Sequence, residues 1–171
     1  LIDEVYTKFG FKYSIELSTR PEDSMGSNED WDLAEESLKG ALDELNLEYK
    51  LNPGDGAFYG PKIDFKLEDS LGRTWQCGTI QLDFQLPKRF EITYVDEQGK
   101  HQTPIILHRV IYGSLERFIG IITEHFNGAF PLWFTPIQVT IATIGSDEHK
   151  KYAEIISKRL LENNIRVENL F

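Results

Sequence analysis

The sequence predicts an α+β domain followed by the first part of an α/β domain. Stretches of alternating polar and apolar residues, separated by short turn segments, are typical of an antiparallel sheet. Other stretches carry apolar residues at helical spacing. After the punctuated segment 131–136 the pattern changes to strand, helix and strand, which implies parallel strands. The 171 residues suffice for one medium domain and part of another.

The first third of the chain predicts a helix, a strand and a second helix. Helical spacing covers Ile2 to Phe9, and Gly10 fits a C-cap. Residues 11–17 alternate as a half-buried strand. Ser27, followed by acids in the first turn, predicts the start of the next helix. We expect that helix to bury Trp31, Ala34, Leu38, Ala41, Leu42 and Leu45.

A hairpin is predicted next, from 63–67 and 73–84 around Asp69–Gly72. Strict alternation places Trp75, Cys77, Thr79, Gln81 and Asp83 on one face of its second strand. The other face then carries Gln76, Gly78, Ile80, Leu82 and Phe84. So many polar side chains on a strand indicate that it lines a cavity.

A further hairpin is predicted from residues 90–95 and 102–106. The β-forming run from Ile105 to Ile111 then leads through Gly113, a turn residue, into a helix with Ser114 as its N-cap. That helix presents Leu115, Phe118, Ile119, Ile122 and Phe126 on one face. Three polar side chains are predicted near this change from strand to helix: His108, Arg109 and Arg117. A cation is unfavourable at a helix N-terminus, so Arg117 indicates a nearby anion.

The predicted second domain holds strands at 137–143 and 165–170 around a helix at 147–162. The apolar face of that helix comprises Tyr152, Ile155, Ile156 and Leu160. Two strands and one helix cannot bury a core alone. We therefore expect the chain to be a piece of a longer protein, with one domain at 1–131 and the beginning of another at 132–171.

Composition limits the function classes. A net charge of −10 argues against charge-driven binding of nucleic acid over a basic face. The single cysteine, Cys77, excludes an internal disulfide and fits a reducing compartment. No apolar run approaches the roughly 20 residues that cross a membrane. The composition predicts a cytoplasmic globular protein without a membrane partner.

Three stretches resemble the threonyl-tRNA synthetase family of class II aminoacyl-tRNA synthetases. They are Gly56–Phe65 (GAFYGPKIDF), Trp75–Phe84 (WQCGTIQLDF) and Leu107–Arg117 (LHRVIYGSLER). The last resembles motif 3 of that class, which spans 105–126 here. LSTRP at 17–21 and FPLWFTP at 130–136 also fit, so the resemblance covers essentially the whole chain. It implies the later half of a class II catalytic domain, with an antiparallel sheet flanked by helices, followed by a truncated anticodon-binding domain.

The resemblance also implies roles for individual residues. His108 matches one of three ligands of an active-site zinc, and Arg117 matches the motif 3 arginine that lies along ATP. Lys62 and Arg117 are the candidate catalytic residues, with Tyr59 and Ser114 as further substrate contacts. The strand beneath threonine and the adenylate is matched by Gln76, Cys77, Thr79, Gln81 and Asp83.

The implied function is a threonine–tRNA ligase that uses ATP with Mg²⁺, threonine and threonine tRNA, and that is a homodimer when intact. Zinc would allow the enzyme to discriminate threonine from the nearly isosteric valine, because the shape of a pocket alone discriminates between such substrates by only about a hundredfold. The other two zinc ligands and motifs 1 and 2 of the family are absent from this sequence. We therefore expect this chain alone to be inactive.

Simpler interpretations accompany each assignment. His108 would, by spacing alone, be a hydrogen-bonded core residue, and Cys77 could be a buried thiol or a second metal ligand. Arg117 could pair with Glu116 or Glu124, and Tyr59 could be core packing. Two alternatives to the function also stay open: a synthetase-derived module that binds RNA or a partner without catalysis, and another class II synthetase, such as the prolyl or seryl enzyme.

Overall fold

The computed structural model describes all residues, 1–171. They form two compact units, Leu1–His125 and Phe126–Phe171. The predicted domain boundary after residue 131 stays a prediction. No helix combines the length and the apolar character that a membrane crossing requires.

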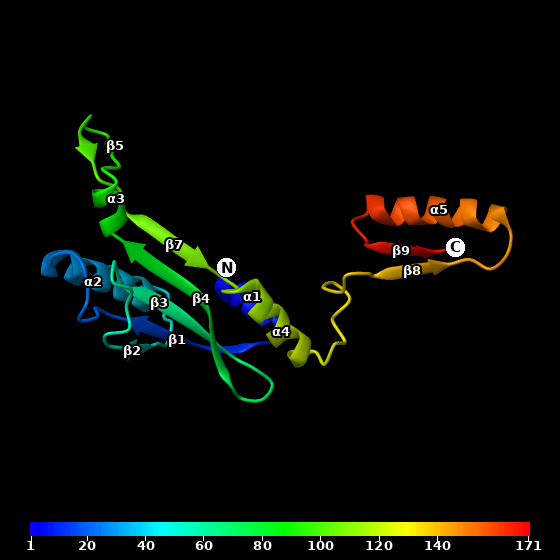
Figure 1. Cartoon of the computed structure of the whole chain (residues 1–171), viewed down its shortest axis with the longest axis horizontal. Coiled ribbons are helices and arrows are strands. Elements are labelled where there is room, and N and C mark those ends of the chain that lie inside the picture. Colours follow the sequence, from blue (N-terminus) through cyan, green and yellow to red (C-terminus); the bar gives the residue numbers. More distant parts are fainter. The chain divides into compact units, whose positions relative to one another are not determined.

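A five-stranded sheet with the order β2-β1-β3-β4-β7 organises the first unit (Figure 1). Its strands are β1 (Lys12–Ser18), β2 (Lys50–Asn52), β3 (Lys62–Glu68), β4 (Thr74–Asp83) and β7 (Ile106–Val110). The prediction of a wholly antiparallel sheet was wrong in one place, since β1 and β2 pair in parallel. Helix α2 (Asn28–Glu44) connects these two strands, and a crossover of that length returns the chain in the same direction.

Three helix boundaries lie where the sequence predicts them. Helix α1 (Ile2–Phe9) ends at Gly10, whose φ of 77° is left-handed. Ser27 caps α2 by accepting a hydrogen bond from the backbone N–H of Asp30. Helix α4 (Leu115–His125) follows the turn at Gly113, where φ is 68°.

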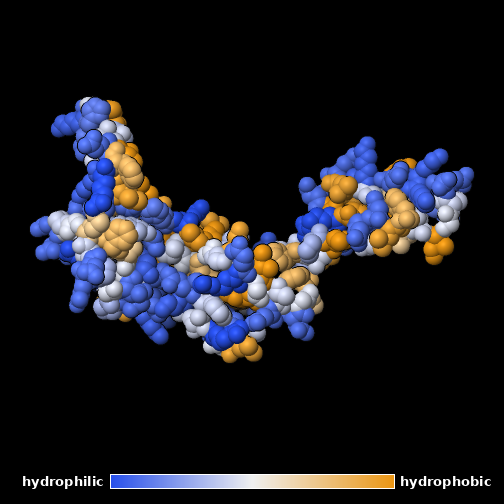
Figure 2. Space-filling view, in the orientation of Figure 1, coloured by the Kyte–Doolittle hydropathy of each residue, from blue (hydrophilic) through white to orange (hydrophobic).

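A short helix and a small hairpin lie between β4 and β7. Helix α3 (Gln85–Arg89) leads into β5 (Tyr94–Val95) and β6 (His101–Gln102), which extend beyond α3, away from the sheet (Figure 1). Figure 2 shows hydrophobic residues along this extension. Phe90, Ile92 and Val95 are exposed in this part of the chain. The predicted strands at 90–95 and 102–106 are thus much shorter in the structure.

The core of the first unit joins one face of the sheet to the helices. The strands contribute Ile15, Leu17, Ile63, Phe65 and Leu67, and the helices contribute Ile2, Tyr6, Phe9, Trp31, Ala34, Leu38, Leu42, Phe118, Ile121 and Ile122. Ala41 and Leu45, predicted to be buried, are exposed because α2 buries a narrower stripe. Gly78 fits this packing, because a Cβ there would lie 2.8 Å from the Tyr6 hydroxyl oxygen.

A β-bulge at Cys77 corrects the predicted faces of β4. Phe65 pairs with Gly78 but Lys66 pairs with Gln76, so β3 skips Cys77. The extra residue reverses the alternation on its N-terminal side. Gln76 therefore shares a face with Thr79 and Gln81, while Trp75 lies on the opposite face, contrary to the strict alternation that the sequence suggested.

The second unit is one β-α-β element, as predicted. Strands β8 (Val139–Ala142) and β9 (Val167–Leu170) pair in parallel, and helix α5 (Asp147–Glu162) connects them. The predicted apolar face of α5 was wrong, because Tyr152, Ile155 and Ile156 are exposed and Leu160 is only half-buried. Ala153 and Ser157 are buried instead, since a two-stranded sheet covers only a narrow strip of the helix.

Candidate active site

One face of the sheet carries polar side chains from four strands, and we call it the polar face. Residues that pair across neighbouring strands share a face. Ser18 pairs with Lys62, which pairs with Gln81, which pairs with His108. The polar face comprises Ser18, Lys62, Asp64, Gln76, Thr79, Gln81, Asp83 and His108. It therefore brings together most of the residues that the sequence predicted as a site.

Asp64 is the centre of what we call the carboxylate cluster, and it is fully buried. Its Oδ2 accepts hydrogen bonds from Ser18 Oγ at 2.8 Å and Lys62 Nζ at 2.6 Å. Its Oδ1 accepts from Gln76 Nε2 at 2.6 Å and Thr79 Oγ1 at 3.0 Å. These donors occupy the acceptor positions of the carboxylate. Sequence reasoning missed Asp64 because alternation alone places a polar residue between Ile63 and Phe65 in solvent.

Lys62 lies where two carboxylates meet. Its side chain is 11% exposed, and Nζ is 3.4 Å from Asp55 Oδ2 in addition to the contact with Asp64. A buried ammonium needs such partners, because an unpaired charge in this position would be costly. The structure thus holds a charged amine at the polar face in a fixed position.

His108 and Asp83 form a second group with Tyr59 and Gln81, the histidine cluster. His108 Nε2 lies 3.0 Å from Asp83 Oδ2, and Asp83 is fully buried. The Tyr59 hydroxyl donates to Gln81 Oε1, and its ring centroid lies 5.7 Å from that of His108. Burial raises the pKa of Tyr59, as does the Asp83 carboxylate, while Lys62 partly offsets the shift. Tyr59 therefore serves as a neutral hydrogen-bond donor rather than as core packing.

The contact with Asp83 fixes which nitrogen of His108 is available. A carboxylate only accepts, so in the neutral imidazole Nε2 carries the hydrogen and Nδ1 keeps a lone pair. Metal-binding histidines commonly have this arrangement, with the second nitrogen donating to a carboxylate. His108 thus fits one position of a metal site. No group of three or more His, Cys, Asp or Glu side chains that could hold a metal occurs in the chain.

Cys77 does not join either cluster. It occupies the bulge in β4 and is 3% exposed. Burial raises the pKa of the Cys77 thiol, and the positive charge of Arg117 partly offsets this. A protonated, buried thiol is a weak metal ligand and a weak nucleophile, which favours the structural interpretation of this residue.

Arg117 lies exposed at the start of α4 without a carboxylate partner. The predicted alternatives are occupied otherwise: Glu124 pairs with Arg73, and Glu116 accepts from the Ser114 hydroxyl. The Arg117 guanidinium carbon lies 5.8 Å from the ring centroid of Trp75. The N–H groups of this guanidinium have no acceptor within the chain, so the cation is suited to bind an anion.

Ser114 and Gly113 position Arg117. The Ser114 hydroxyl accepts from the backbone N–H of Arg117 at 3.3 Å, which confirms the predicted capping contact. A Cβ at Gly113 would lie 2.8 Å from the carbonyl oxygen of Cys77, so only glycine permits this approach of α4 to β4. Arg109, which the sequence grouped with His108 and Arg117, pairs with Ile80 and lies on the opposite face of the sheet.

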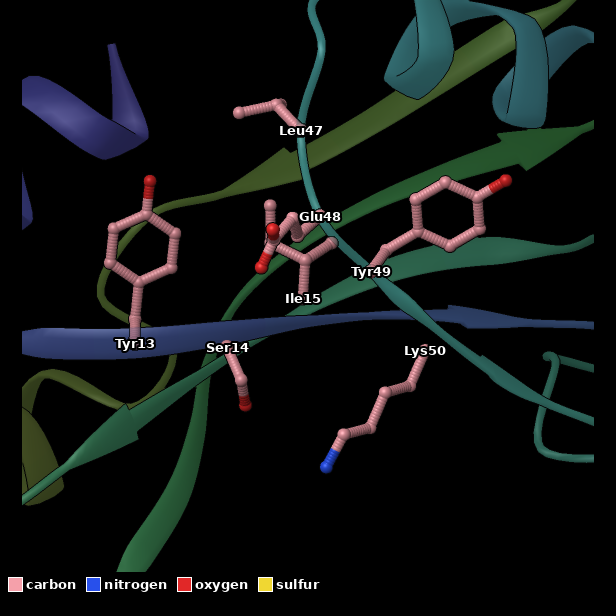
Figure 3. A pocket seen from close by; sticks show the side chains of 7 residues that line it. All are labelled: Tyr13, Ser14, Ile15, Leu47, Glu48, Tyr49 and Lys50. Atoms are coloured by element: carbon pink, nitrogen blue, oxygen red, sulfur yellow. The ribbon is translucent and has the colours of Figure 1, made fainter.

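A separate pocket of about 380 Å³ opens at another edge of the sheet (Figure 3). It is lined by Tyr13, Ser14, Ile15, Leu47, Glu48, Tyr49 and Lys50. Figure 3 shows Tyr13 and Leu47 on one side of the β1 ribbon and Ser14 and Lys50 on the other. These side chains do not converge on a common point, and none of them belongs to the polar face.

Comparison with known proteins gives the chain a family. Residues 1–126 match the family described as "tRNA synthetase class II core domain (G, H, P, S and T)". The chain belongs to this family of class II tRNA synthetase core domains. The fold and the motif 3 resemblance predicted from sequence agree with this assignment.

Individual relatives narrow the similarity. The chain is 61% identical over 168 residues to the threonine–tRNA ligase of Clostridium tetani, and 59% identical over 168 residues to that of Carboxydothermus hydrogenoformans. Each match covers 98% of this chain but 26% of the relative. The chain therefore spans about a quarter of the length of these relatives.

Solved structures agree. A structure titled as the RNA binding domain of threonyl-tRNA synthetase from Cryptosporidium parvum matches with a TM-score of 0.84 and 45% identity, over 98% of this chain and 42% of that one. A putative threonyl-tRNA synthetase from Aeropyrum pernix matches with a TM-score of 0.69 and 33% identity, over 99% of this chain and 44% of that one. Histidyl-tRNA synthetase of S. aureus, at 14% identity and a TM-score of 0.53, over 99% and 53%, shares the fold alone.

Proposed function

We propose that this chain contributes part of the active site of a threonine–tRNA ligase. Such an enzyme converts threonine and ATP to threonyl-adenylate and pyrophosphate, and then transfers the threonyl group to the 3′ end of threonine tRNA with release of AMP. The observation that most supports this proposal is Arg117, an exposed arginine that lies over Trp75 without any carboxylate partner. The choice of threonine rests on relatives that are 59–61% identical and bear that name.

The chemistry asks for the groups that the polar face and Arg117 offer. Attack of the threonine carboxylate on the α-phosphorus of ATP needs positioning and charge neutralisation more than a general base. Arg117 would grip the phosphates with its planar guanidinium, and Lys62 would add a fixed positive charge. Mg²⁺ would accompany ATP. Tyr59, Gln76, Thr79 and Gln81 would supply neutral hydrogen bonds that orient the substrates.

His108 would be one zinc ligand, through Nδ1, with the remaining ligands supplied from outside this chain. A bound Zn²⁺ would supply open coordination positions for the amino and hydroxyl groups of threonine, and valine, which lacks the hydroxyl, could fill only one of them. Asp83 would keep the ring of His108 in the orientation and tautomer that this requires. We further propose a cytoplasmic homodimer, on the basis of the resemblance to this family.

The test uses a complete ligase in which this chain replaces the matching stretch of the Clostridium tetani relative. We expect threonine-dependent exchange of pyrophosphate into ATP by this chimera. His108→Ala and Arg117→Ala should each abolish most of that exchange. Asp96→Asn, in the β5–β6 hairpin, serves as a control and should leave it unchanged. A folded chimera without exchange for any amino acid would favour a binding module without catalysis.

A further inference from the structure

Asp64 is a fully buried member of the polar face, and the proposed function gives it no contact with substrate. Its exposed fraction is 0%, and the four side chains that bind it come from three strands. Two of these side chains, Gln76 and Thr79, and the amine of Lys62 are among the groups that the proposed function directs at substrate. The following inference rests on that function.

The carboxylate fixes the hydrogen-bonding polarity of its partners. Because the Asp64 carboxylate only accepts hydrogen bonds, Gln76 must direct its Nε2 group toward it, and the Oε1 of Gln76 then points elsewhere. The Ser18 and Thr79 hydroxyls likewise donate their single hydrogens to Asp64, so toward other groups their oxygens can act only as acceptors. One buried group thus determines the donor and acceptor character of three neighbours.

Asp64 also fixes the location of positive charge. Lys62 Nζ lies 2.6 Å from Asp64 but 3.4 Å from the half-exposed Asp55. Without Asp64, the remaining partner would pull the amine toward solvent, along the direction of Asp55. Displacement of a catalytic group by about 1 Å can lower a rate about a hundredfold.

We propose that Asp64 is a positioning residue for adenylate formation, which holds the Lys62 amine and the polar groups of Gln76 and Thr79 in one fixed arrangement. It does not touch substrate itself, because its carboxylate oxygens are enclosed by these groups. The same arrangement explains why Asp64 is fully buried although alternation along β3 places it on the polar face of the sheet.

The test compares substitutions in the complete ligase described above, with rates expressed per active site after burst titration. Asp64→Asn keeps the shape but places an amide N–H₂ among donors. We expect it to lower kcat of threonine-dependent exchange about 10- to 100-fold. Adding Lys62→Met should then lower kcat by less than about twofold, because residues that act as a unit give non-additive effects.

A milder pair of substitutions keeps the proposal testable should Asp64→Asn fail to fold. Ser18→Ala removes one donor to Asp64 and leaves every substrate-facing group in place. Ser157→Ala removes a similarly buried hydroxyl, which accepts from Asn169 in the second unit. We expect a roughly three- to tenfold loss of kcat for Ser18→Ala, and less than about twofold for Ser157→Ala.

Three results would overturn the proposal: unchanged kcat per active site in Asp64→Asn, losses that multiply when Lys62→Met is added, or equal effects of the two serine substitutions. Failure of the proposed function would look different. In that case the unsubstituted ligase would be folded and would give no exchange with threonine.

Discussion

Substitution of Asp83 by asparagine or by alanine should separate two tasks that this buried carboxylate performs. Oδ1 accepts hydrogen bonds from the backbone N–H groups of Gln85 and Leu86, both at 2.9 Å, where α3 begins. Oδ2 holds His108 Nε2 at 3.0 Å. Alanine removes both contacts. Asparagine keeps an oxygen for the backbone but places an amide N–H opposite the histidine.

The first task has a measurable free energy. Loss of a side chain that caps a helix start costs about 0.5–2 kcal/mol. Because about 1.4 kcal/mol corresponds to a factor of ten, the amide hydrogens of Gln85 and Leu86 should exchange about 2- to 30-fold faster in Asp83→Ala. In Asp83→Asn their exchange should stay within about twofold of the parent. Amide exchange followed by NMR on the labelled chain measures both.

The second task concerns the tautomer of His108. An asparagine N–H donates, so Nε2 must accept and the ring hydrogen must move to Nδ1, the proposed metal-binding atom. We expect both Asp83 variants of the complete ligase to bind zinc about 10- to 100-fold more weakly. Asp96→Asn is the matched control, since Asp96 also accepts from two backbone N–H groups but contacts no histidine.

Two results would refute this reasoning. One is unchanged exchange of the Gln85 and Leu86 amides in Asp83→Ala, which would mean that Asp83 does not stabilise the start of α3. The other is parental zinc affinity in Asp83→Asn, which would mean that the tautomer of His108 is not set by its carboxylate partner.

Three further predictions concern the hairpin, the turn before β3 and the motif 3 arginine. Burial alone would raise the pKa of Asp69, but hydrogen bonds, the strongest from Trp75, hold it well below its usual range. Its stabilisation should be complete above the unfolded-state pKa of about 3.9 and disappear as pH falls through the lower folded-state value, as acid unfolding against Asp69→Asn would measure. Gly60→Ala should destabilise the fold by about 1–3 kcal/mol in denaturant unfolding, because a Cβ would lie 1.7 Å from the Leu82 carbonyl oxygen. Arg117→Lys keeps the charge but loses the planar guanidinium, and should lower exchange activity at least about tenfold in the complete ligase.

Each of these has a contrary outcome. Identical acid unfolding of the parent and Asp69→Asn would exclude a lowered folded-state pKa. Gly40 is the matched glycine, with open space around its Cβ position, so equal destabilisation by Gly40→Ala would remove the steric explanation for Gly60. Full activity of Arg117→Lys would mean that a point charge suffices at this position.

Local patterns were sufficient to predict most elements of the fold. Gly10, Ser27 and Gly113 each mark a helix boundary through a backbone requirement that acts within a few residues, so these boundaries follow from sequence. The parallel pairing of β2 with β1 could not be predicted in the same way. It depends on where the chain returns after α2, which is a long-range property.

The candidate site was predictable in its residue types but not in its arrangement. Strict alternation assigned Gln76 and Thr79 to opposite faces. This was wrong because a single bulged residue, Cys77, changes the register of β4. The only local signal of the bulge in the sequence is Gly78. The same rule placed Asp64 in solvent. Besides the neighbouring Lys62, its burial depends on Ser18, Gln76 and Thr79 from other strands, and these partners cannot be predicted from the pattern within β3.

The most direct test of the central claim is the amino-acid dependence of pyrophosphate exchange by the complete ligase. Threonine and serine should support exchange, because both carry a hydroxyl group beside the amino group, whereas valine should not. Exchange with threonine that is lost in His108→Ala would agree with the account. Exchange that depends on a different amino acid, such as proline, or that is insensitive to His108→Ala, would contradict it.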